Sequence, residues 1–260
     1  MLFSIVTINY NNLAGLQKTV ESVLHQTCQD FQYIIIDGDS NDGSINYLKK
    51  INYKNFDIVS EKDHGIYDAM NKGIQLSTGD YIIFLNSGDF FPRDSVLQNI
   101  KNFINESKNK IDFIYGDAYE YSPRKEKFYL KISKSHLSAW YGMFAHHQSM
   151  VYSNEIIKKY NIRYDLSYNL ASDWDFTLRF MNYCKNIKKV NFPLSVFEQG
   201  GYSDKFIIGL NEQYKIRLKT LKFSPIKSAT IYCYHFLLNS VRKAFPYIYN
   251  DVRMSAIDKL

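Results

Sequence analysis

The sequence predicts an α/β fold in which a mostly parallel central sheet is flanked by helices. Four short segments are largely apolar and lack regular polar alternation: 3–9, 33–37, 56–60 and 81–85. Strands with this composition are typically buried on both faces. Between the first two of them, Leu13, Leu16, Val20 and Val23 recur at helical spacing. Strands that alternate with amphipathic helices indicate a parallel sheet covered on both faces.

The remaining elements follow in order along the chain. Helices are expected through Ile45 and Leu48 and over 66–76, with Gly79 just past the end of the second one. After Pro92 the pattern changes, and further helices are expected over 95–104, 153–160 and 172–183. Strands are expected over 113–116, 127–132 and 148–152, and a long basic helical region starts at 205. The second half is therefore expected to extend the same sheet as a mixed region.

Composition and charge favour a globular protein and argue against one that binds nucleic acid. Hydrophobic residues make up 45% and charged residues 22%, as in an ordinary soluble globule. The net charge of +6 arises in segment 213–260, which holds nine Lys or Arg against two Asp. The rest of the chain holds 23 basic and 24 acidic side chains. A nucleic-acid-binding body would carry a basic face of its own, so that class is not favoured.

Cysteine usage and hydropathy suggest where the protein works. The three cysteines lie far apart with no CxxC pair, which argues against a zinc ribbon or a disulfide framework and favours a reducing compartment. The first residues lack the basic region and cleavage site of a signal peptide. The longest uncharged stretch of the tail, 228–241, is shorter than the ~20 apolar residues that a spanning helix needs. We expect a cytoplasmic location.

Polar and acidic residues follow all four of the first strands. Asn9 ends the first strand, Asp37 the second, Glu61 and Asp63 follow the third, and Asp89 follows the fourth. The carboxyl ends of parallel strands border one crevice, where ligands bind. Clustered oxygen ligands at such a crevice suit Mg²⁺ or Mn²⁺, and such an ion could neutralise the charge that grows on a departing diphosphate. Neither GxGxxG nor a P-loop is present, so a dinucleotide fold and an NTPase are not supported.

A second acidic motif begins the helix expected over 172–183. Asp173 and Asp175 stand two residues apart, which is about 200° around a helix, so they cannot both face one site. One of them could act as a general base toward an acceptor hydroxyl. The other is expected to be a helix-start or surface acid.

Taken together, the motifs resemble glycosyltransferase family 2, whose members have the Rossmann-like GT-A fold and are inverting, metal-dependent enzymes that use nucleotide sugars. The resemblance covers about residues 3–204, in the family's order. It rests on SIVTINYN (4–11), SVLHQT (22–27), IDGDSNDG (36–43), GIYDAMNKG (65–73), TGD (78–80), FLNSGD (84–89), HQ (147–148), SDWD (172–175) and GGYS (200–203). The chain is most similar to the branch that builds bacterial surface polysaccharides such as O-antigen or capsule.

The resemblance implies a role for each matching residue. Nucleotide contacts are implied for Thr7, Asn9, Tyr10 and Asp37, and for Asp68 and Asn71 on the helix that closes on the nucleotide. The segment Asn86-Ser87-Gly88-Asp89 stands in place of an Asp-x-Asp-Asp stretch, which implies diphosphate contacts for Ser87, Gly88 and Asp89, and Mn²⁺ or Mg²⁺ binding for Asp89. Asp173 matches the catalytic base. The acceptor side is implied to include His147, Gln148 and Trp174.

Four positions depart from the family pattern. Asn86 and Gly88 replace two acids of the Asp-x-Asp-Asp stretch, Gly38 replaces the second acid of Asp-Asp-Gly-Ser, and Ser172 replaces the glutamate of Glu-Asp. The first two replacements leave open whether a metal is obligatory.

Each of these residues also has a structural interpretation. Asp37 and Asp89 could be turn acids, Asp173 could cap its helix, and His147 could be a buried histidine. Trp140 and Trp174 could pack in the core instead of stacking on sugars. Two other functions also stay open. One is a catalytically inactive module that binds a nucleotide sugar or carbohydrate, and the other is a sugar nucleotidyltransferase.

The resemblance also suggests a domain organisation and partners. We expect a nucleotide-sugar-binding half over 1–106, an acceptor-side half on the same sheet over 107–204, and a basic helical tail over 205–260. The expected partners are a nucleotide-diphosphate sugar, with UDP the family's commonest nucleotide, and a saccharide acceptor that could be lipid-linked. Apolar residues at helical spacing in the basic segment 213–260 would suit peripheral contact with the inner face of the plasma membrane. The alternative is that the tail packs on the body.

Overall fold

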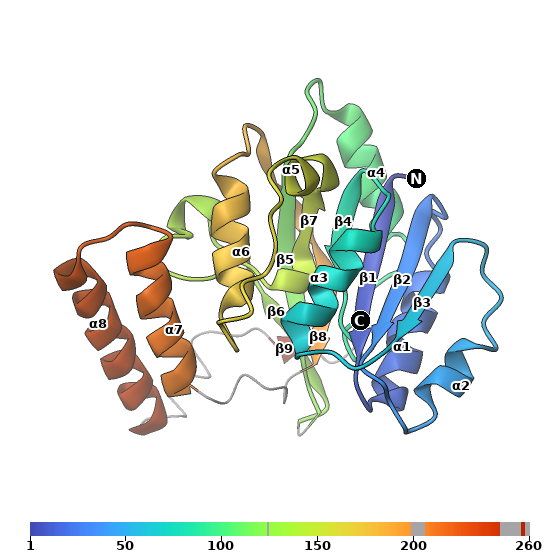
Figure 1. Cartoon of the computed structure of the whole chain (residues 1–260). Coiled ribbons are helices and arrows are strands. Elements are labelled where there is room, and N and C mark those ends of the chain that lie inside the picture. The colour runs from blue at the N-terminus through green and yellow to red at the C-terminus, as the bar shows by residue number, and fades with distance from the viewer. Residues whose placement is uncertain (124, 199–205, 245–255, 258–260) are drawn as a thin grey trace.

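The computed structural model describes residues 1–123, 125–198, 206–244 and 256–257. Within these residues, nine strands form one sheet with helices on both faces (Figure 1). The strand order is β3-β2-β1-β4-β7-β5-β6-β9, and β8 pairs with β5. The α/β fold with a mostly parallel first half is therefore confirmed. The motif at 200–203 lies outside the described residues.

The first half of the sheet is parallel, and antiparallel pairing begins at β7. The parallel strands are β1 (Phe3–Asn9), β2 (Phe31–Asp37), β3 (Phe56–Ser60) and β4 (Tyr81–Phe84). β7 (Met150–Ser153) is antiparallel to both β4 and β5 (Phe113–Ser122), and β5 also pairs with β6 (Lys127–Lys131). β8 (Ile187–Glu198) runs parallel to β5, and the short β9 (Ala256–Ile257) pairs with β6.

The helices cover both faces of the sheet. They are α1 (Leu13–Leu24), α2 (Ser44–Leu48), α3 (Ile66–Leu76), α4 (Val96–Glu106), α5 (Asn154–Lys159), α6 (Ser172–Met181), α7 (Phe206–Lys219) and α8 (Pro225–Ala244). Two short 3₁₀ helices, η1 (His136–Ser138) and η2 (His147–Ser149), lie between β6 and β7.

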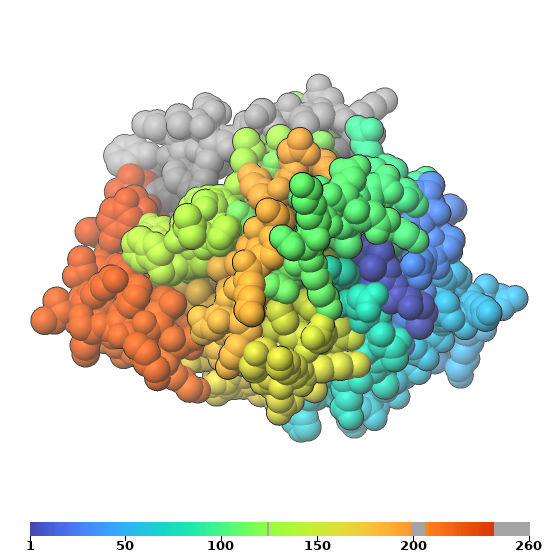
Figure 2. All heavy atoms as spheres, turned by 90° about the horizontal axis from the view of Figure 1, so that it is seen from above, coloured from blue at the N-terminus to red at the C-terminus, as the bar shows by residue number. Residues whose placement is uncertain are grey.

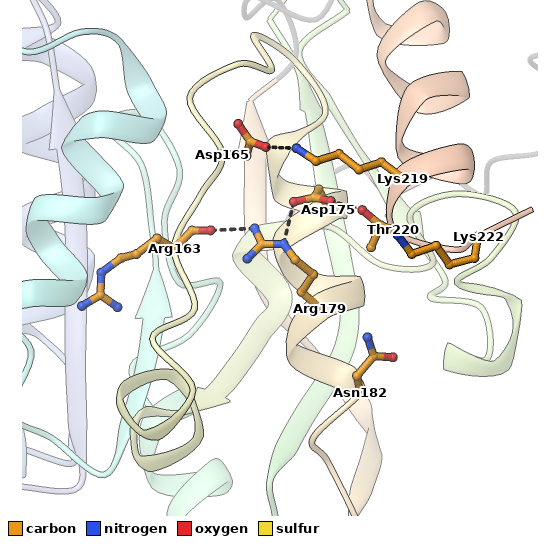
Figure 3. Close-up of a pocket in the computed structure, with 8 residues that line it drawn as sticks. All are labelled: Arg163, Asp165, Asp175, Arg179, Asn182, Lys219, Thr220 and Lys222. Carbon is orange, nitrogen blue, oxygen red and sulfur yellow. Dashed lines mark hydrogen bonds and ion pairs between the residues drawn. The ribbon is translucent and has the colours of Figure 1, made fainter.

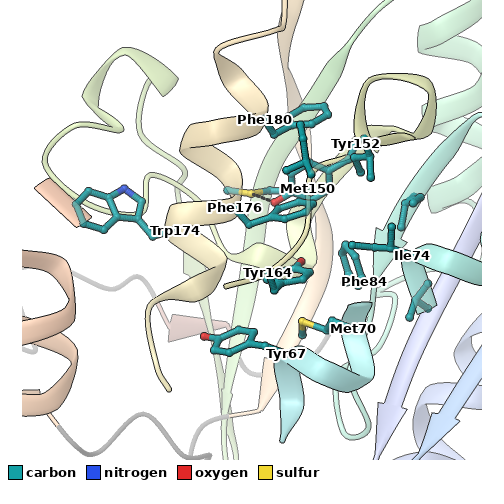
Figure 4. Packing of buried hydrophobic residues seen from close by; sticks show 14 of the residues in the cluster. Tyr67, Met70, Ile74, Phe84, Met150, Tyr152, Tyr164, Trp174, Phe176 and Phe180 are labelled. Atoms are coloured by element: carbon teal, nitrogen blue, oxygen red, sulfur yellow. Dashed lines mark hydrogen bonds between the residues drawn. The ribbon is translucent and has the colours of Figure 1, made fainter. Parts of the chain in front are cut away.

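Two apolar clusters lie on opposite faces of the sheet, because successive strand residues point to opposite sides. Val6 and Ile8 of β1 belong to the cluster beneath α3 and α6, which is rich in aromatic rings (Figure 4). Phe3 and Ile5 belong to the cluster beneath α1, α2 and α4. This arrangement leaves the carboxyl ends of β1, β2 and β4 at one edge, the lower edge in Figure 1.

Gly79 has a different role from the one expected. α3 ends at Leu76, and Gly79 lies against β1, where an added Cβ would stand 2.5 Å from the carbonyl carbon of Phe3. The hydroxyl of Ser4 accepts hydrogen bonds from the N–H groups of Thr78 (3.1 Å) and Gly79 (2.8 Å). Glycine is therefore required here for close approach of the backbone.

The C-terminal half differs from expectation in several elements. β5 covers Phe113–Ser122, where a strand was expected only over 113–116, and residues 148–149, expected in a strand, belong to η2. The sequence did not indicate β8, whose lysines and Pro193 interrupt any apolar pattern and whose pairing with β5 contains register shifts. The expected long helical region is two helices, α7 and α8, which form the end of the molecule opposite α2 and β3 (Figures 1 and 2). Among the helices of the described residues, none is long and apolar enough to span a bilayer.

Candidate active site

Asp37 joins the ends of three neighbouring strands. Its Oδ1 accepts hydrogen bonds from Asn9 Nδ2 and Ser40 Oγ, both at 2.7 Å. Its Oδ2 accepts from the Ser40 N–H at 2.9 Å and from Ser60 Oγ at 3.0 Å. Asn9 ends β1 and Ser60 ends β3, so this fully buried carboxylate organises the carboxyl edge of the sheet. Both of its oxygens are occupied by protein donors.

Thr7 and Asn9 lie on β1 in different environments. The Thr7 hydroxyl is buried and donates a 2.7 Å hydrogen bond to the carbonyl of Leu85, so it ties β1 to the segment after β4. The side-chain oxygen Oδ1 of Asn9 is also buried, and it has no partner among the described residues. An acceptor is thus available at the end of β1.

The glycine that replaces a family acid stands beside another acid. A Cβ added at Gly38 would lie 2.8 Å from Oδ2 of Asp63 and 3.2 Å from Cδ2 of Tyr10. Asp63 belongs to the loop between β3 and α3, and the Tyr10 side chain is 68% exposed. Because Gly38 has no side chain, a carboxylate from a different loop and an exposed ring can occupy this space. The chain therefore retains an acid at this place.

The turn after β4 explains a second replacement. Gly88 has a φ of +103°, a left-handed conformation that strains any residue with a Cβ. Its N–H donates a 2.9 Å hydrogen bond to the hydroxyl of Thr19 on α1. Ser87 is tied to Asn12, which precedes α1, by a hydrogen bond from Asn12 Nδ2 to the Ser87 carbonyl at 3.2 Å. An acid at position 88 would have to adopt a strained backbone in this turn.

Asp89 is a buried carboxyl at the end of the same turn. Its Oδ2 accepts a 2.9 Å hydrogen bond from Gln148 Nε2, and the Glu198 N–H lies 3.4 Å from its Oδ1. Burial raises the pKa of Asp89 to about 7, and the hydrogen bonds from Glu198 and Gln148 only partly oppose this effect. Lys18, which forms a 3.0 Å ion pair with Glu198, supplies the nearby positive charge.

Two side chains of this turn offer oxygen atoms of the kind that binds a hard divalent cation. Asp89 offers a carboxylate, and the amide oxygen of Asn86 is buried without a partner in the described part of the chain. Mg²⁺ is commonly held by one or two carboxylates together with substrate phosphates. Across the residues that the structure describes, no three His, Cys, Asp or Glu form a group that could hold a metal ion. The donor set therefore does not amount to a closed protein chelate.

Asp173 is the second residue of α6. Its Oδ1 accepts a 2.8 Å hydrogen bond from the N–H of Trp174. The pKa of Asp173 is raised to about 6. Burial is the main cause and the negative charge of Glu212 adds to it, whereas the hydrogen bond from Trp174 lowers the pKa. The hydroxyl of Tyr67 on α3 is close enough for the charge of Asp173 to raise its pKa, in addition to the larger effect of burial. Since α3 and α6 both begin at the lower edge in Figure 1, Asp173 lies at the sheet edge that carries Asp37 and Asp89.

His147 and Gln148 lie beneath the site. The imidazole of His147 is buried, stacks on Phe84 with ring centroids 5.0 Å apart, and its Nε2 lies 2.6 Å from the Tyr164 hydroxyl. Burial lowers the pKa of His147 to about 3, so the ring is neutral near pH 7. Gln148 contacts Asp89. The structure thus places Gln148 against the turn after β4, and His147 against Phe84 and Tyr164. The acceptor-side role that the resemblance implied for them stays a prediction.

Asp68 and Asn71 lie on α3. Asn71 makes two hydrogen bonds to the backbone of Tyr164, through Nδ2 at 3.0 Å and Oδ1 at 2.8 Å. It therefore fixes the segment that leads to α6. Burial alone would raise the pKa of Asp68, but the N–H of His64 and the charge of Lys72 outweigh it and hold the pKa below its usual value.

The tryptophans occupy different environments. Trp174 is buried, and its Nε1–H donates a 2.8 Å hydrogen bond to the carbonyl of Ala139. Its indole lies in the core and not on an exposed acceptor surface (Figure 4). Trp140 is 44% exposed beside Phe223.

Asp175 is buried and has protein partners of its own, so it is not the surface acid that was one expectation for this pair. Its Oδ2 accepts a 2.7 Å hydrogen bond from Arg179 Nε, and its Oδ1 accepts one of 2.5 Å from the Thr220 hydroxyl (Figure 3). These groups line a cavity of about 470 Å³ beside α6, together with Arg163, Asp165, Asn182, Lys219 and Lys222. Asp37, Asp89 and Asp173 do not line this cavity.

The sequence motifs did not reveal several residues that shape the site. Asp63 was visible only as one of two acids after β3, and Thr19 as a polar residue on the buried face of α1. Glu212 is the one acid of α7, whose other residues are apolar, uncharged polar or basic. An isolated acid in such a helix is a weak signal that could have drawn attention to it.

Comparison with known proteins identifies the family of this chain. The family profile described as Glycosyl transferase family 2 matches residues 4–161, which is more than half of the chain. The PGL/p-HBAD biosynthesis glycosyltransferase of Mycobacterium bovis is 30% identical over 195 residues, covering 68% of this chain and 69% of its own. An uncharacterized glycosyltransferase of Mycobacterium tuberculosis is 31% identical, covering 71% and 70%. The chain belongs to glycosyltransferase family 2.

Solved structures confirm the GT-A fold class. S. aureus TarS 1–349 in complex with UDP-GlcNAc superposes with a TM-score of 0.68 at 16% identity, covering 95% of this chain and 73% of its own. The mannosyltransferase PcManGT of Pyrobaculum calidifontis, in complex with GDP-Man and Mn²⁺, gives a TM-score of 0.62 at 13% identity, covering 85% and 64%. At these identities the likeness concerns the fold alone.

Proposed function

We propose that this family 2 enzyme is an inverting glycosyltransferase that moves a sugar from a nucleoside diphosphate to a hydroxyl of a saccharide acceptor in bacterial surface-polysaccharide synthesis. The position of Asp173 carries the proposal: a partly desolvated carboxylate at the start of α6, at the same sheet edge as Asp37 and Asp89. A pKa of about 6 leaves it ionised, yet still able to accept a proton, near pH 7.

The donor is proposed to bind across the ends of β1, β2 and β4. The exposed ring of Tyr10 is available to stack on a nucleobase, and Oδ1 of Asn9 can accept a hydrogen bond from it. Relatives in this fold class bind UDP-GlcNAc and GDP-Man, and we propose a UDP-sugar. The diphosphate would lie beside Ser87, Gly88 and Asp89.

The chemical step is a direct displacement. Asp173 takes the proton of the acceptor hydroxyl as its oxygen forms a bond to the anomeric carbon. The bond from that carbon to the diphosphate oxygen breaks, and its electron pair leaves with the nucleoside diphosphate. Mn²⁺ or Mg²⁺ held by Asp89, with the Asn86 amide as a second oxygen ligand, would supply charge neutralisation to the leaving group. Asp89 is held for this task by Gln148.

An experiment on the product tests the proposal. A panel of sugar nucleotides is first screened by thermal shift with Mn²⁺ or Mg²⁺, and the stabilising donor is then incubated with saccharide acceptors. Nuclear magnetic resonance of the product should show an anomeric configuration opposite to that of the donor. Retained configuration would contradict the mechanism. Donor binding with neither transfer nor hydrolysis would favour a catalytically inactive binding module.

We also propose that α8 lies on an anionic membrane surface, which would suit a lipid-linked acceptor. Its outer stripe exposes apolar side chains at helical spacing, including Ile226, Leu237 and Val241. Lys222 and Lys227 are exposed at its start. Apolar side chains flanked by basic ones suit interfacial binding. The full chain should float with phosphatidylglycerol vesicles, and the Leu237→Asp/Val241→Asp variant should not. Equal flotation of both proteins would exclude this surface.

A further inference from the structure

Glu212 on α7 binds the backbone that leads directly into the start of α6. Its Oε1 accepts a 2.7 Å hydrogen bond from the N–H of Asn169, and its Oε2 accepts hydrogen bonds from the N–H groups of Leu170 (2.8 Å) and Ala171 (2.9 Å). Glu212 is buried, with only 5% of its surface exposed. Three consecutive N–H groups are thus held by one buried carboxylate from a distant part of the chain.

This contact holds the backbone just before the first turn of α6, which has no side-chain cap of its own. The N-cap of α6 is Ala171, which has no side-chain oxygen to accept hydrogen bonds from the first turn. The segment before the helix therefore depends on another part of the chain for its partners. Because Asp173 comes two residues after Ala171, any movement of this segment also moves its carboxylate.

Arg217 fixes α7 on the other side of Asp173. Its fully buried guanidinium donates a 2.8 Å hydrogen bond from Nη2 to the carbonyl of Tyr141 and lies 5.1 Å from the ring centroid of Trp174, the residue after Asp173. One turn of α7 separates Glu212 from Ile216, which is also completely buried. α7 therefore contacts the chain immediately before and immediately after Asp173.

We propose that Glu212 is a positioning residue, which holds segment 169–171 so that the Asp173 carboxylate keeps the orientation needed to accept the acceptor proton. This inference rests on the proposed role of Asp173 as the base. It assigns a part in the reaction to α7, which lies beyond the region matched by the family profile.

The charge of Glu212 acts on Asp173 as well. The negative charge raises the pKa of Asp173, in addition to the larger effect of burial. Among the residues that the structure describes, the other titratable groups whose pKa responds to Asp173 are phenols from α3, from β7 and from the segment before α6: Tyr67, Tyr152 and Tyr164. Burial raises the pKa of each phenol, so all three are neutral near pH 7. Glu212 is therefore the group whose charge can be removed to change the titration of the base.

Two variants separate orientation from charge. Glu212→Asp keeps the charge but shortens the side chain, so kcat should fall about 10- to 100-fold while the acidic limb of the kcat–pH profile stays in place. Glu212→Gln keeps the length, loses the charge and presents an amide donor to N–H groups, so kcat should fall and the acidic limb should move to lower pH. In both variants the donor KM should be unchanged, and amide hydrogen exchange at residues 169–171 should accelerate.

Lys219→Met is the matched control. This substitution removes a different contact between α7 and the loop before α6, the 3.0 Å ion pair of Lys219 with Asp165. It leaves the hydrogen bonds to residues 169–171 in place. It should leave kcat and the pH profile unchanged. UDP binding by calorimetry verifies that each variant is folded.

The outcomes distinguish the positioning role of Glu212 from the proposed role of Asp173 as the base. If Asp173→Asn is inactive while both Glu212 variants keep the wild-type kcat and pH profile, the positioning role is overturned and the base survives. Full turnover by Asp173→Asn would instead remove the base, and with it the reason for positioning.

Discussion

Gln148 donates a 2.9 Å hydrogen bond from Nε2 to Oδ2 of Asp89, a contact between η2 and the turn after β4. Gln148 is buried beside His147, whose imidazole stacks on Phe84 of β4. The histidine–glutamine pair thus joins the antiparallel half of the sheet to the proposed diphosphate site. Its function is predicted to be support of Asp89, not contact with the acceptor.

Replacement of Gln148 by leucine should weaken donor binding. A hydrogen bond to a charged group is worth about 1.5–3 kcal/mol, so the Kd of the nucleotide sugar with Mn²⁺ should rise roughly 10- to 100-fold by calorimetry. Gln26→Leu is the control, because Gln26 is also buried but bonds the backbone of Arg93 and Leu97. It should lower the melting temperature without a change in Kd. Equal Kd values for both variants would contradict the role of Gln148.

Replacement of Asp173 by asparagine should remove the base and leave the nucleotide site intact. Loss of a general base lowers kcat by about 10²–10⁴-fold, and the Kd for UDP should stay at the wild-type value. Asp175→Asn is the comparison, since Asp175 binds Arg179 and Thr220 on the other side of α6. Its kcat should remain close to wild type below its melting temperature. The reverse pattern would assign the base to Asp175.

The pH dependence follows from the raised pKa of Asp173. Only the ionised carboxylate accepts a proton, so kcat should decline below pH 6 and be about tenfold lower at pH 5 than on the plateau. Stability should respond in the opposite direction. Because burial raises this pKa in the folded protein, the contribution of Asp173 to stability is greatest below about pH 4 and is lost as the pH rises through 6. Transfer assays stopped at fixed times across pH 4.5–8 measure the decline of kcat below pH 6. A kcat that stays constant down to pH 5 would contradict the role of Asp173 as the base.

Replacement of Gly38 by alanine should disturb the proposed nucleobase site. The new Cβ would stand 2.8 Å from Oδ2 of Asp63, so Asp63 and Tyr10 must move. Overpacking of this kind costs about 1–3 kcal/mol, and the Kd for UDP should rise on the order of tenfold. Gly142→Ala is the control, because a Cβ at that position meets no atom within 4 Å. An unchanged Kd in Gly38→Ala would place the nucleobase elsewhere.

Local sequence patterns were sufficient to predict the parallel half of the fold. The runs at β1, β2 and β4 are buried on both faces, so their composition alone identified them. β8 was not predicted because two adjacent lysines, Asn191 and Pro193 interrupt its apolar residues, and its place in the sheet depends on pairing with β5. The ends of β6 and α4 shifted by one or two residues, as local signals do not fix the final turn of an element.

The candidate site was predictable only in part, for a physical reason. Asp37 and Asp89 stand at or after the carboxyl ends of parallel strands, and parallel topology brings such ends together. Asp173 begins α6, which follows the antiparallel strand β7, so the strand rule does not place it. The partners of these acids come from distant segments, as when Gln148 reaches Asp89 and Glu212 reaches the start of α6. Asp63 could not be assigned beside Gly38 from the sequence, because that proximity depends on the path of the loop after β3. Such contacts arise from tertiary packing, which spacing along the chain does not encode.

The contacts between α7 and the start of α6 have a consequence for how the activities of related proteins can diverge. Nucleotide contacts would reside in the first strands, whereas the setting of Asp173 is completed by Glu212 and Arg217 near the other end of the chain. A chimera that exchanges α7 and α8 between two relatives would therefore change the surroundings of Asp173, the proposed base. The pH dependence of such a chimera would then follow the source of its last helices, independently of the donor site.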